Sequence, residues 1–146
     1  FPLVKSFRDC TENQLEKLRD ELGEILFKRC HFVVNEIRRV NEAVAALDKN
    51  DFEKLGQLMY ETHDGLSKEY EVSCEEIDFL VASVRHEKSV LGARMMGGGF
   101  GGCSLNLVEK GTEEALITKI SEAYLKEFGL TLSAYKVKIS KGTTNV

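Results

Sequence analysis

The sequence lacks the features that mark several large classes of protein. Its apolar stretches fall short of the roughly 18 residues that a membrane-spanning helix needs, so no membrane association is expected. It has no run of Lys or Arg and its formal net charge is −4, which argues against a nucleic-acid surface. Its first residues, Phe1 to Lys5, show no apolar core followed by a cleavage site, so they do not look like a secretory signal.

Closely spaced cysteines are also absent. The four cysteines are Cys10, Cys30, Cys74 and Cys103, with no C-x-x-C among them. A disulfide framework needs denser spacing, so we expect buried, reduced thiols and a cytoplasmic protein. The three histidines are His31, His63 and His86. None pairs with cysteines at zinc-finger spacing, and no metal ligands are expected in this chain.

The composition is that of a globular protein with a core. Hydrophobic residues make up 42% and charged residues 30% of 146 residues, a length that suits one domain over residues 1–146. Because residue 1 is not Met, we expect either a processed chain or a fragment of a longer protein.

Helical periodicity fills the first half of the sequence. Thr11 to Gln14 reads as a capping box, and Gly23 interrupts the helix that follows. A long amphipathic helix with its apolar stripe toward the core is then expected up to about residue 50. The stripe consists of Leu26, Cys30, Val33, Ile37, Val40, Val44 and Leu47. A coiled coil competes with this reading, but the pattern lasts only about three heptads.

The remaining elements suggest helices followed by strands. Asn50 is expected to cap a helix over about 51–69, and Ser73 to Glu76 to form a capping box that opens a third helix. Alternation predicts a strand over 103–108, after a short run at 93–96, and another over 135–139. A helix lies between these strands, starting at Thr112 and closed by Gly129, and the tail from Ser140 is expected to be mobile. The prediction is an α+β fold, with a helical layer on a small antiparallel sheet.

Five of the 12 glycines fall within residues 97–102. Such a cluster has one of two uses. It allows positive φ angles and close approach by a ligand or another segment, as in a phosphate cradle, or it forms a tight turn between two strands. The match to G-x-G-x-x-G is rejected as a dinucleotide site, because a strand and not a helix follows. No Lys-Ser/Thr pair closes the run, so it is not a P-loop either.

Four segments resemble the galactokinase family of the GHMP small-molecule kinases, in the family's order. Residues 92–103, GARMMGGGFGGC, resemble its third conserved motif, and residues 70–78, YEVSCEEID, its D-Y-E-V-S-C-P-E-L-D segment. Residues 29–36 resemble its R-x-x-H-V-V-x-E helix, and residues 52–66 its F-G-x-L-M-x-x-S-H-x-S-L helix. Three positions depart from the pattern: Met96 replaces Thr, Gly65 replaces Ser and Glu75 replaces Pro.

The resemblance implies a GHMP-type, ferredoxin-like C-terminal domain. It implies a full-length enzyme that phosphorylates the anomeric hydroxyl of galactose with ATP and Mg²⁺. The third motif would brace the phosphate-binding loop of the N-terminal domain through its backbone. Those bracing residues would be Gly97, Gly98, Gly99, Phe100, Gly101 and Gly102.

Two family motifs are absent, G-R-x-N-L-I-G-E-H-x-D-Y and P-x-G-x-G-L-S-S-S-A. The catalytic Asp and the neighbouring Arg would belong to that missing half, so no catalytic residue is expected here. The expected partners of the full-length protein are galactose, ATP and its own N-terminal domain. The chain alone should bind no cofactor, be inactive, expose apolar surface around 93–102 and self-associate. Two alternatives stay open: another GHMP kinase, or a catalytically silent relative that senses galactose and ATP.

Individual side chains are expected to be mostly structural. His31 is expected to pack or lie at the surface, whereas His63 is a candidate for a role near the cleft. Arg94 could form an ion pair with Glu36. Packing is also the main expectation for three apolar residues of the glycine-rich segment, Met95, Met96 and Phe100.

Overall fold

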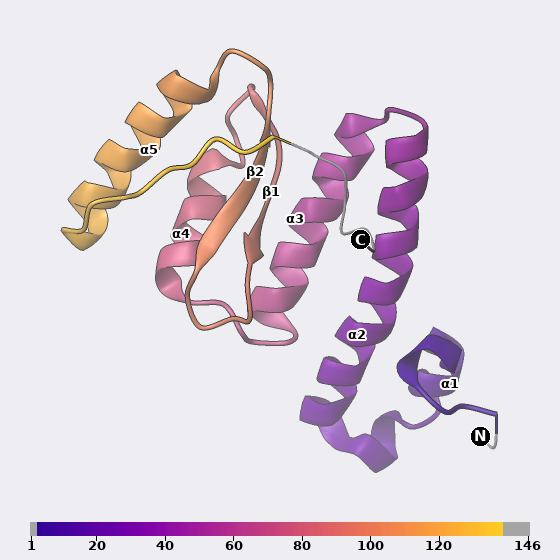
Figure 1. Ribbon diagram of the computed structural model, residues 1–146. Coiled ribbons are helices and arrows are strands. Elements are labelled where there is room, and N and C mark those ends of the chain that lie inside the picture. Colours follow the sequence, from indigo (N-terminus) through magenta and orange to yellow (C-terminus); the bar gives the residue numbers. More distant parts are fainter. Residues whose placement is uncertain (1–2, 139–146) are drawn as a thin grey trace, which may run out of the picture. The chain divides into compact units, whose positions relative to one another are not determined.

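The computed structural model describes residues 3–138, which fall into two units. The first unit is Phe1–Val108 and the second is Glu109–Val146. Figure 1 shows the helices and the two strands along the chain, and each unit is described by itself.

The first unit is a set of helices around a two-stranded sheet. Helices α3 and α4 both contact β1, and α2 packs along α3. Its elements are the 3₁₀ turn η1 (Phe7–Asp9), helices α1 (Glu12–Glu16), α2 (Arg19–Asp48), α3 (Phe52–Lys68) and α4 (Glu75–Val84), and strands β1 (Val90–Met96) and β2 (Cys103–Val108). The α+β prediction of a helical layer on a small antiparallel sheet is confirmed.

The start of the helical region follows local sequence rules. Thr11 and Gln14 form the expected capping box, in which each side chain bonds the other residue's backbone N–H. Gly23 interrupts α2 with a φ of 71°, as its place between two apolar phases suggested. The other two caps differ from expectation. Asp51, not Asn50, caps α3, since its carboxylate accepts from Lys54 N at 2.9 Å. Cys74 caps α4 without a side-chain hydrogen bond, so the expected box at Ser73 does not form.

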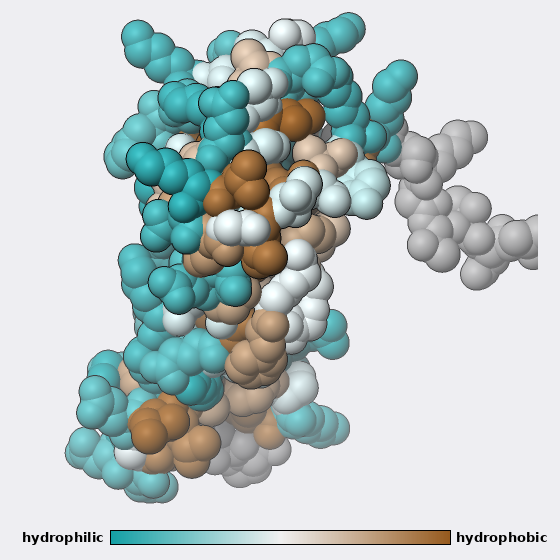
Figure 2. Space-filling view, turned by 90° about the vertical axis from the view of Figure 1, so that its left-hand side faces the viewer, coloured by the Kyte–Doolittle hydropathy of each residue, from teal (hydrophilic) through white to brown (hydrophobic). Residues whose placement is uncertain are grey.

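The side of α2 that is buried differs from the predicted apolar stripe. Its buried residues are Phe27, Phe32, Asn35, Arg39 and Ala46. Four stripe residues are exposed instead: Leu26 (57%), Val40 (56%), Val44 (54%) and Leu47 (46%). The prediction that these four face the core is wrong, because α3 packs against a neighbouring side of the helix. Three of these exposed residues, Val40, Val44 and Leu47, are called the α2 apolar face below. Hydrophobic residues also lie uncovered among hydrophilic ones on the face drawn in Figure 2.

A glycine pair brings α3 unusually close to β1. A Cβ atom at Gly56 would lie 2.0 Å from the Leu91 carbonyl oxygen, and one at Gly92 would lie 2.3 Å from the Gly56 Cα. Such distances leave no room for a side chain at either position. The core of this unit includes Met95 of β1 and Val81 of α4, both almost completely buried.

Strands β1 and β2 form an antiparallel hairpin, with Met96 opposite Cys103 and Val90 opposite Val108. A register irregularity lies between Val90 and Gly92. The predicted strand over 103–108 is confirmed at its bounds. The strand predicted over 135–139 is wrong for 135–138, which has no strand pairing in the structure. Its end and the tail from Ser140 lie outside the described residues.

The second unit contains helix α5 (Glu113–Phe128). Gly129 ends it in the left-handed conformation, with a φ of 68°, as predicted. The segment 130–138 that follows has no helix or strand, and Lys136 in it pairs with Glu114 of α5. Within α5, the rings of Tyr124 and Phe128 lie 4.9 Å apart.

Candidate functional site: the glycine loop

Residues 97–102, called the glycine loop, connect β1 to β2. Five of its six residues have positive φ: Gly97 (119°), Gly99 (97°), Phe100 (59°), Gly101 (137°) and Gly102 (106°). Four of them are glycines, in conformations that L side chains rarely adopt. The reading of the cluster as a turn between two strands is confirmed, since the loop connects the paired strands β1 and β2. The reading as a phosphate cradle stays a prediction.

One side of the loop is anchored on the connection between α3 and α4. Phe100 N donates to the Val72 carbonyl oxygen at 2.7 Å. A Cβ atom at Gly99 would lie 2.8 Å from the same oxygen, so only glycine allows this approach. Two of the segments that carry the family resemblance therefore meet here, YEVSC and the glycine-rich motif.

The other side of the loop is open. Apart from the adjacent residues of the chain, no described atom lies within 4 Å of the Cβ position at Gly97, Gly98 or Gly101. Gly98 also lacks a positive φ, so nothing in residues 3–138 requires glycine there. The flanking Met96 and Phe100 are 46% and 77% exposed, so the expectation that they pack in the core is wrong. The loop thus presents bare backbone and two exposed apolar side chains. The expected exposure of apolar surface around 93–102 is confirmed for Met96 and Phe100 but not for Ala93 and Met95, which are buried.

Helix α2 holds the connection that receives the loop. Glu71 has a φ of 57° and pairs with two α2 side chains, Lys28 at 3.2 Å and Arg29. Arg29 also donates to the Glu69 carbonyl oxygen. The hydrogen bond from Arg29, followed by that from Lys28, lowers the pKa of the Glu71 carboxyl. His31 lies 3.0 Å from the Glu69 carboxylate, so it serves this same junction.

His63 of α3 lies beneath the base of the loop. It is buried, and its Nδ1 accepts a hydrogen bond from Met95 N at 3.3 Å. Its Nε2 lies 3.3 Å from Asp78 Oδ1 in α4, while Ser67 Oγ donates to Asp78 Oδ2 at 2.7 Å. Burial lowers the pKa of His63, and the Asp78 carboxylate opposes that shift. These residues line one end of a groove of about 360 Å³.

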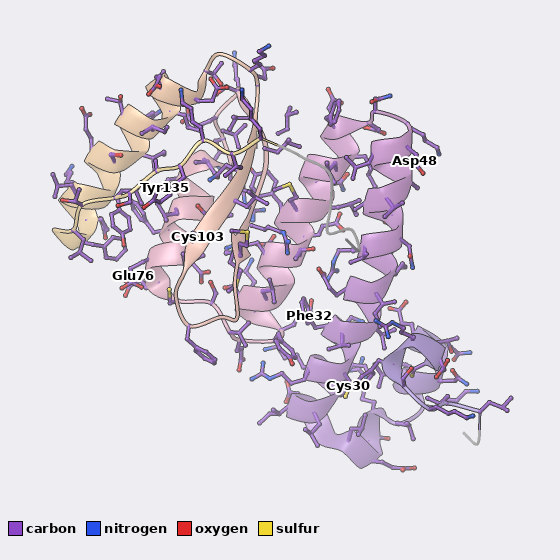
Figure 3. The ribbon with its side chains drawn as sticks, in the orientation of Figure 1. Cys30, Phe32, Asp48, Glu76, Cys103 and Tyr135 are labelled. Carbon is purple, nitrogen blue, oxygen red and sulfur yellow. The ribbon has the colours of Figure 1, made fainter. Side chains whose placement is uncertain are left out.

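The predicted pairing of Arg94 with Glu36 does not occur. Glu36 instead binds Arg39 of its own helix at 2.8 Å and accepts from Thr62 Oγ1 at 3.0 Å. This network joins α2 to α3 and stays inside the helical layer. Phe32 lies beside it, with its ring against Gly65 of α3 (Figure 3). The network therefore holds the helices together and does not reach the loop.

The site offers backbone groups and positioning contacts. Among residues 3–138 no group of three or more His, Cys, Asp or Glu side chains could hold a metal ion. All four cysteines are free thiols, but Cys103 is exposed and the other three are half-buried, so the expectation that they are buried is wrong. No described helix is long and apolar enough to cross a membrane. Cys103 lies at the start of β2, next to the loop (Figure 3).

Sequence patterns missed two parts of the site. One is the Glu71 junction, because a left-handed glutamate leaves no signal in sequence. The other is the Gly56–Gly92 contact, although a glycine within a helical pattern was a usable hint.

Known proteins resemble the chain over nearly all of its length. A galactokinase of Thermotoga petrophila is 42% identical over 97% of this chain. One of Roseiflexus is 37% identical over 100% of it. The chain spans only 39% and 37% of those two proteins. The crystal structure of Lactococcus lactis galactokinase complexed with galactose superposes with a TM-score of 0.83 at 30% identity, covering 88% of this chain and 33% of that one.

The family model described as "GHMP kinases C terminal" matches residues 43–126, more than half of the chain. The matched range runs from the end of α2 through the glycine loop and most of α5. The anchored, glycine-rich hairpin described above therefore lies within the region that defines the family. On these grounds the chain belongs to the C-terminal family of the GHMP kinases.

Proposed function

We propose that this chain is the C-terminal part of a galactokinase, which transfers the terminal phosphoryl group of ATP to the anomeric hydroxyl of galactose. The observation that carries the proposal is the 42% identity to a galactokinase over 97% of the chain. The geometry is consistent with it, because the two most family-like segments build one anchored loop. We further propose that the full-length enzyme is cytoplasmic, which the widely spaced free thiols support.

The glycine loop would brace the phosphate-binding loop supplied by the rest of the protein. Its residues Gly97 to Gly102 offer backbone without side chains, and Gly97, Gly98 and Gly101 face open space. A neighbouring backbone can approach such a surface closely, and exposed peptide N–H groups suit a phosphate-rich surrounding. Held at Val72 and at Met95, the loop can keep that neighbour in place.

Phosphoryl transfer depends chiefly on positioning and on charge stabilisation. ATP and Mg²⁺ would supply the transferred group and neutralise its charge. The family resemblance implies that the Mg²⁺ ligands belong to the rest of the protein, and we assign none to residues 3–138. This chain's own contribution is to place backbone, and a displacement of about 1 Å at the reacting phosphate can cost roughly 100-fold in rate.

The test is an assay of the full-length protein that contains this chain. Galactose-dependent turnover of ATP is expected, with galactose 1-phosphate identified by ³¹P NMR and glucose as the control sugar. The isolated chain 1–146 should show no turnover. ATP turnover with a different small molecule but not with galactose would identify another GHMP kinase. Binding of galactose and ATP without turnover would identify a sensor, and either result would overturn the proposal.

A further inference from the structure

Two hydrogen bonds hold the glycine loop, and their acceptors lie on α3 and on the connection that follows it. On one side, Met95 N donates to His63 Nδ1 one residue before the end of β1. On the other side, Phe100 N donates to the Val72 carbonyl oxygen. The exposed residues 96–98 lie between these points. Val72 belongs to the connection that leads into α4, and Asp78 of α4 faces the other nitrogen of His63.

We propose that His63 is a positioning residue, which fixes the direction in which β1 delivers the glycine loop by accepting the Met95 N–H while its ring is held against Asp78. This inference rests on the proposed function, since the loop is taken to brace the phosphate-binding loop. No atom of His63 lies within 4 Å of the Cβ positions on the loop's open side, so the proposed role is indirect. It acts through Met95, whose side chain is 2% exposed and therefore cannot shift without disturbing the core.

A histidine suits this position because its two nitrogens have different tasks. Nδ1 must be unprotonated to accept the Met95 N–H, so the ring proton lies on Nε2, which faces Asp78 Oδ1 at 3.3 Å. Asp78 Oδ1 is buried and has no hydrogen-bond partner among the described residues. Asp78 is oriented through its other oxygen, by Ser67. His63 and Asp78 are thus close enough for an electrostatic interaction but are not aligned for a hydrogen bond. The direct link from His63 to the loop is the hydrogen bond that Nδ1 accepts.

Burial, only partly opposed by the surrounding charges, keeps the ring neutral near neutral pH. Burial is the largest effect and lowers the pKa of His63. Asp78 of α4 and Asp64 of α3 oppose it, whereas Arg85 and Lys68 add to it. Arg85 forms a bidentate pair with Asp64 at 2.7 and 3.1 Å, so much of the negative charge near the ring is already compensated. The acceptor state of Nδ1 is therefore the resting state.

Two amide variants separate the two tasks of the ring. His63→Asn places its amide oxygen near the Nδ1 position and can keep the bond to Met95. His63→Gln places its amide nitrogen near the Nε2 position and can keep only the contact with Asp78. Both variants remove the ring and similar packing, so a purely structural histidine would lose about equally in the two. The difference between the variants is the signal.

The experiment measures kcat and KM of the full-length protein, together with amide hydrogen exchange at Met95 and residues 97–102. We expect kcat to be about 10-fold to 100-fold lower in His63→Gln than in His63→Asn, with KM for galactose changed only a few-fold. Exchange of the Met95 and loop amides should be faster in His63→Gln. Equal kcat and equal exchange in the two variants would overturn the proposal.

A second measurement needs no substitution. In the unmodified protein with ¹⁵N-labelled histidine, the ring shifts should show the proton of His63 on Nε2. A proton on Nδ1 would overturn the inference, because that nitrogen could not accept from Met95. This readout decides the question even where a variant fails to fold. Should the parent protein lack galactose-dependent turnover, the proposed function fails, while the exchange and ring-proton results still test the positioning role.

Discussion

Two neighbouring glycines in the loop have different physical reasons to be glycine. Gly99 combines a φ of 97° with a carbonyl oxygen 2.8 Å from its Cβ position, so the fold itself requires it. Gly98 has neither a positive φ nor a neighbour within 4 Å. A residue that the described chain leaves unconstrained, inside a region that defines the family, points to a requirement set by another segment.

Gly98→Ala and Gly99→Ala should therefore behave oppositely. Gly98→Ala is expected to leave the stability of the chain unchanged or raise it by about 0.5 kcal/mol, because alanine restricts the unfolded chain. The same change should lower the turnover of the full-length protein at least 10-fold. Gly99→Ala should cost roughly 1–3 kcal/mol through strain and contact with Val72. The measurements are thermal unfolding and turnover on the same samples, and full activity in Gly98→Ala would show that nothing approaches the loop there.

His63 gives the stability a pH dependence of predictable sign. Its pKa is lowered in the folded state from an ordinary value of 6.5, so the unfolded chain binds the proton more readily. The stabilisation is complete above about pH 6.5 and is lost as the pH falls toward the folded-state pKa. The thermal midpoint of the parent should drop between about pH 7.5 and 5.5 more than that of His63→Gln. Parallel curves for the two proteins would mean that His63 takes up its proton as easily folded as unfolded.

At the scale of elements, α3 is fitted to β1 by two backbones in contact. A Cβ atom at Gly56 would meet backbone, not a flexible side-chain end, at the Leu91 carbonyl. Relief would require the helix to move away from the strand that carries Met95. The contact therefore sets the distance between His63 on α3 and the backbone N–H on β1 that donates to it.

Gly56→Ala should destabilise the chain by about 1–3 kcal/mol or more, in spite of the better helix propensity of alanine. It should also weaken the loop anchor, because α3 carries His63. Denaturant unfolding measures the first effect and hydrogen exchange at Met95 the second. Gly98→Ala serves as the control, since it adds the same methyl group where there is space. A Gly56→Ala protein as stable as the parent would show that α3 and β1 do not approach so closely.

Local sequence rules predicted where helices and strands begin and end better than they predicted which side of each element is buried. The capping box at Thr11, the break at Gly23, the strand over 103–108 and the stop at Gly129 depend on residues close in sequence, and all four are confirmed. The buried side of α2 depends on where α3 crosses it, which periodicity does not encode. A period-two pattern over 135–138 likewise has no strand pairing, because alternation indicates a possible strand and not its partner.

The site shows the same division. The glycine cluster was visible as a run of letters, and the family resemblance assigned it a role that stays a prediction. Its anchors on Val72 and His63 were not visible, because each is a contact between distant parts of the chain. His63 itself was singled out only by resemblance, and its Nδ1 bond depends on the packing of three elements.

At the scale of the whole molecule, the chain carries apolar surface that its own described residues do not cover. Val40, Val44 and Leu47 follow one side of α2 at 46–56% exposure, and Phe100 is 77% exposed in the loop. The chain spans 39% of the length of its Thermotoga petrophila relative. Exposed apolar side chains of this kind favour association when nothing covers them.

The isolated chain should therefore self-associate. Light scattering or sedimentation of chain 1–146 is expected to show a concentration-dependent rise in mass. Val40→Lys together with Val44→Lys should shift the chain toward monomer by placing charge on the α2 apolar face, with little change in stability. The matched control is Ala45→Lys, at an exposed position of the same helix. A parent chain that remains monomeric at every concentration would contradict this prediction.

The long-range anchors also bear on the order of folding. The helix pair α2–α3 and the hairpin β1–β2 are each built from consecutive elements of the chain, whereas Met95 of the hairpin reaches His63 of the helix pair across 32 residues. Closing such spans costs entropy that only later contacts repay. We expect helices and hairpin to form first and the amides of Met95 and Phe100 to gain protection last, in pulse-labelled hydrogen exchange. A newly synthesised chain would then pass through an intermediate in which the helices and the hairpin have formed but the glycine loop is not yet anchored.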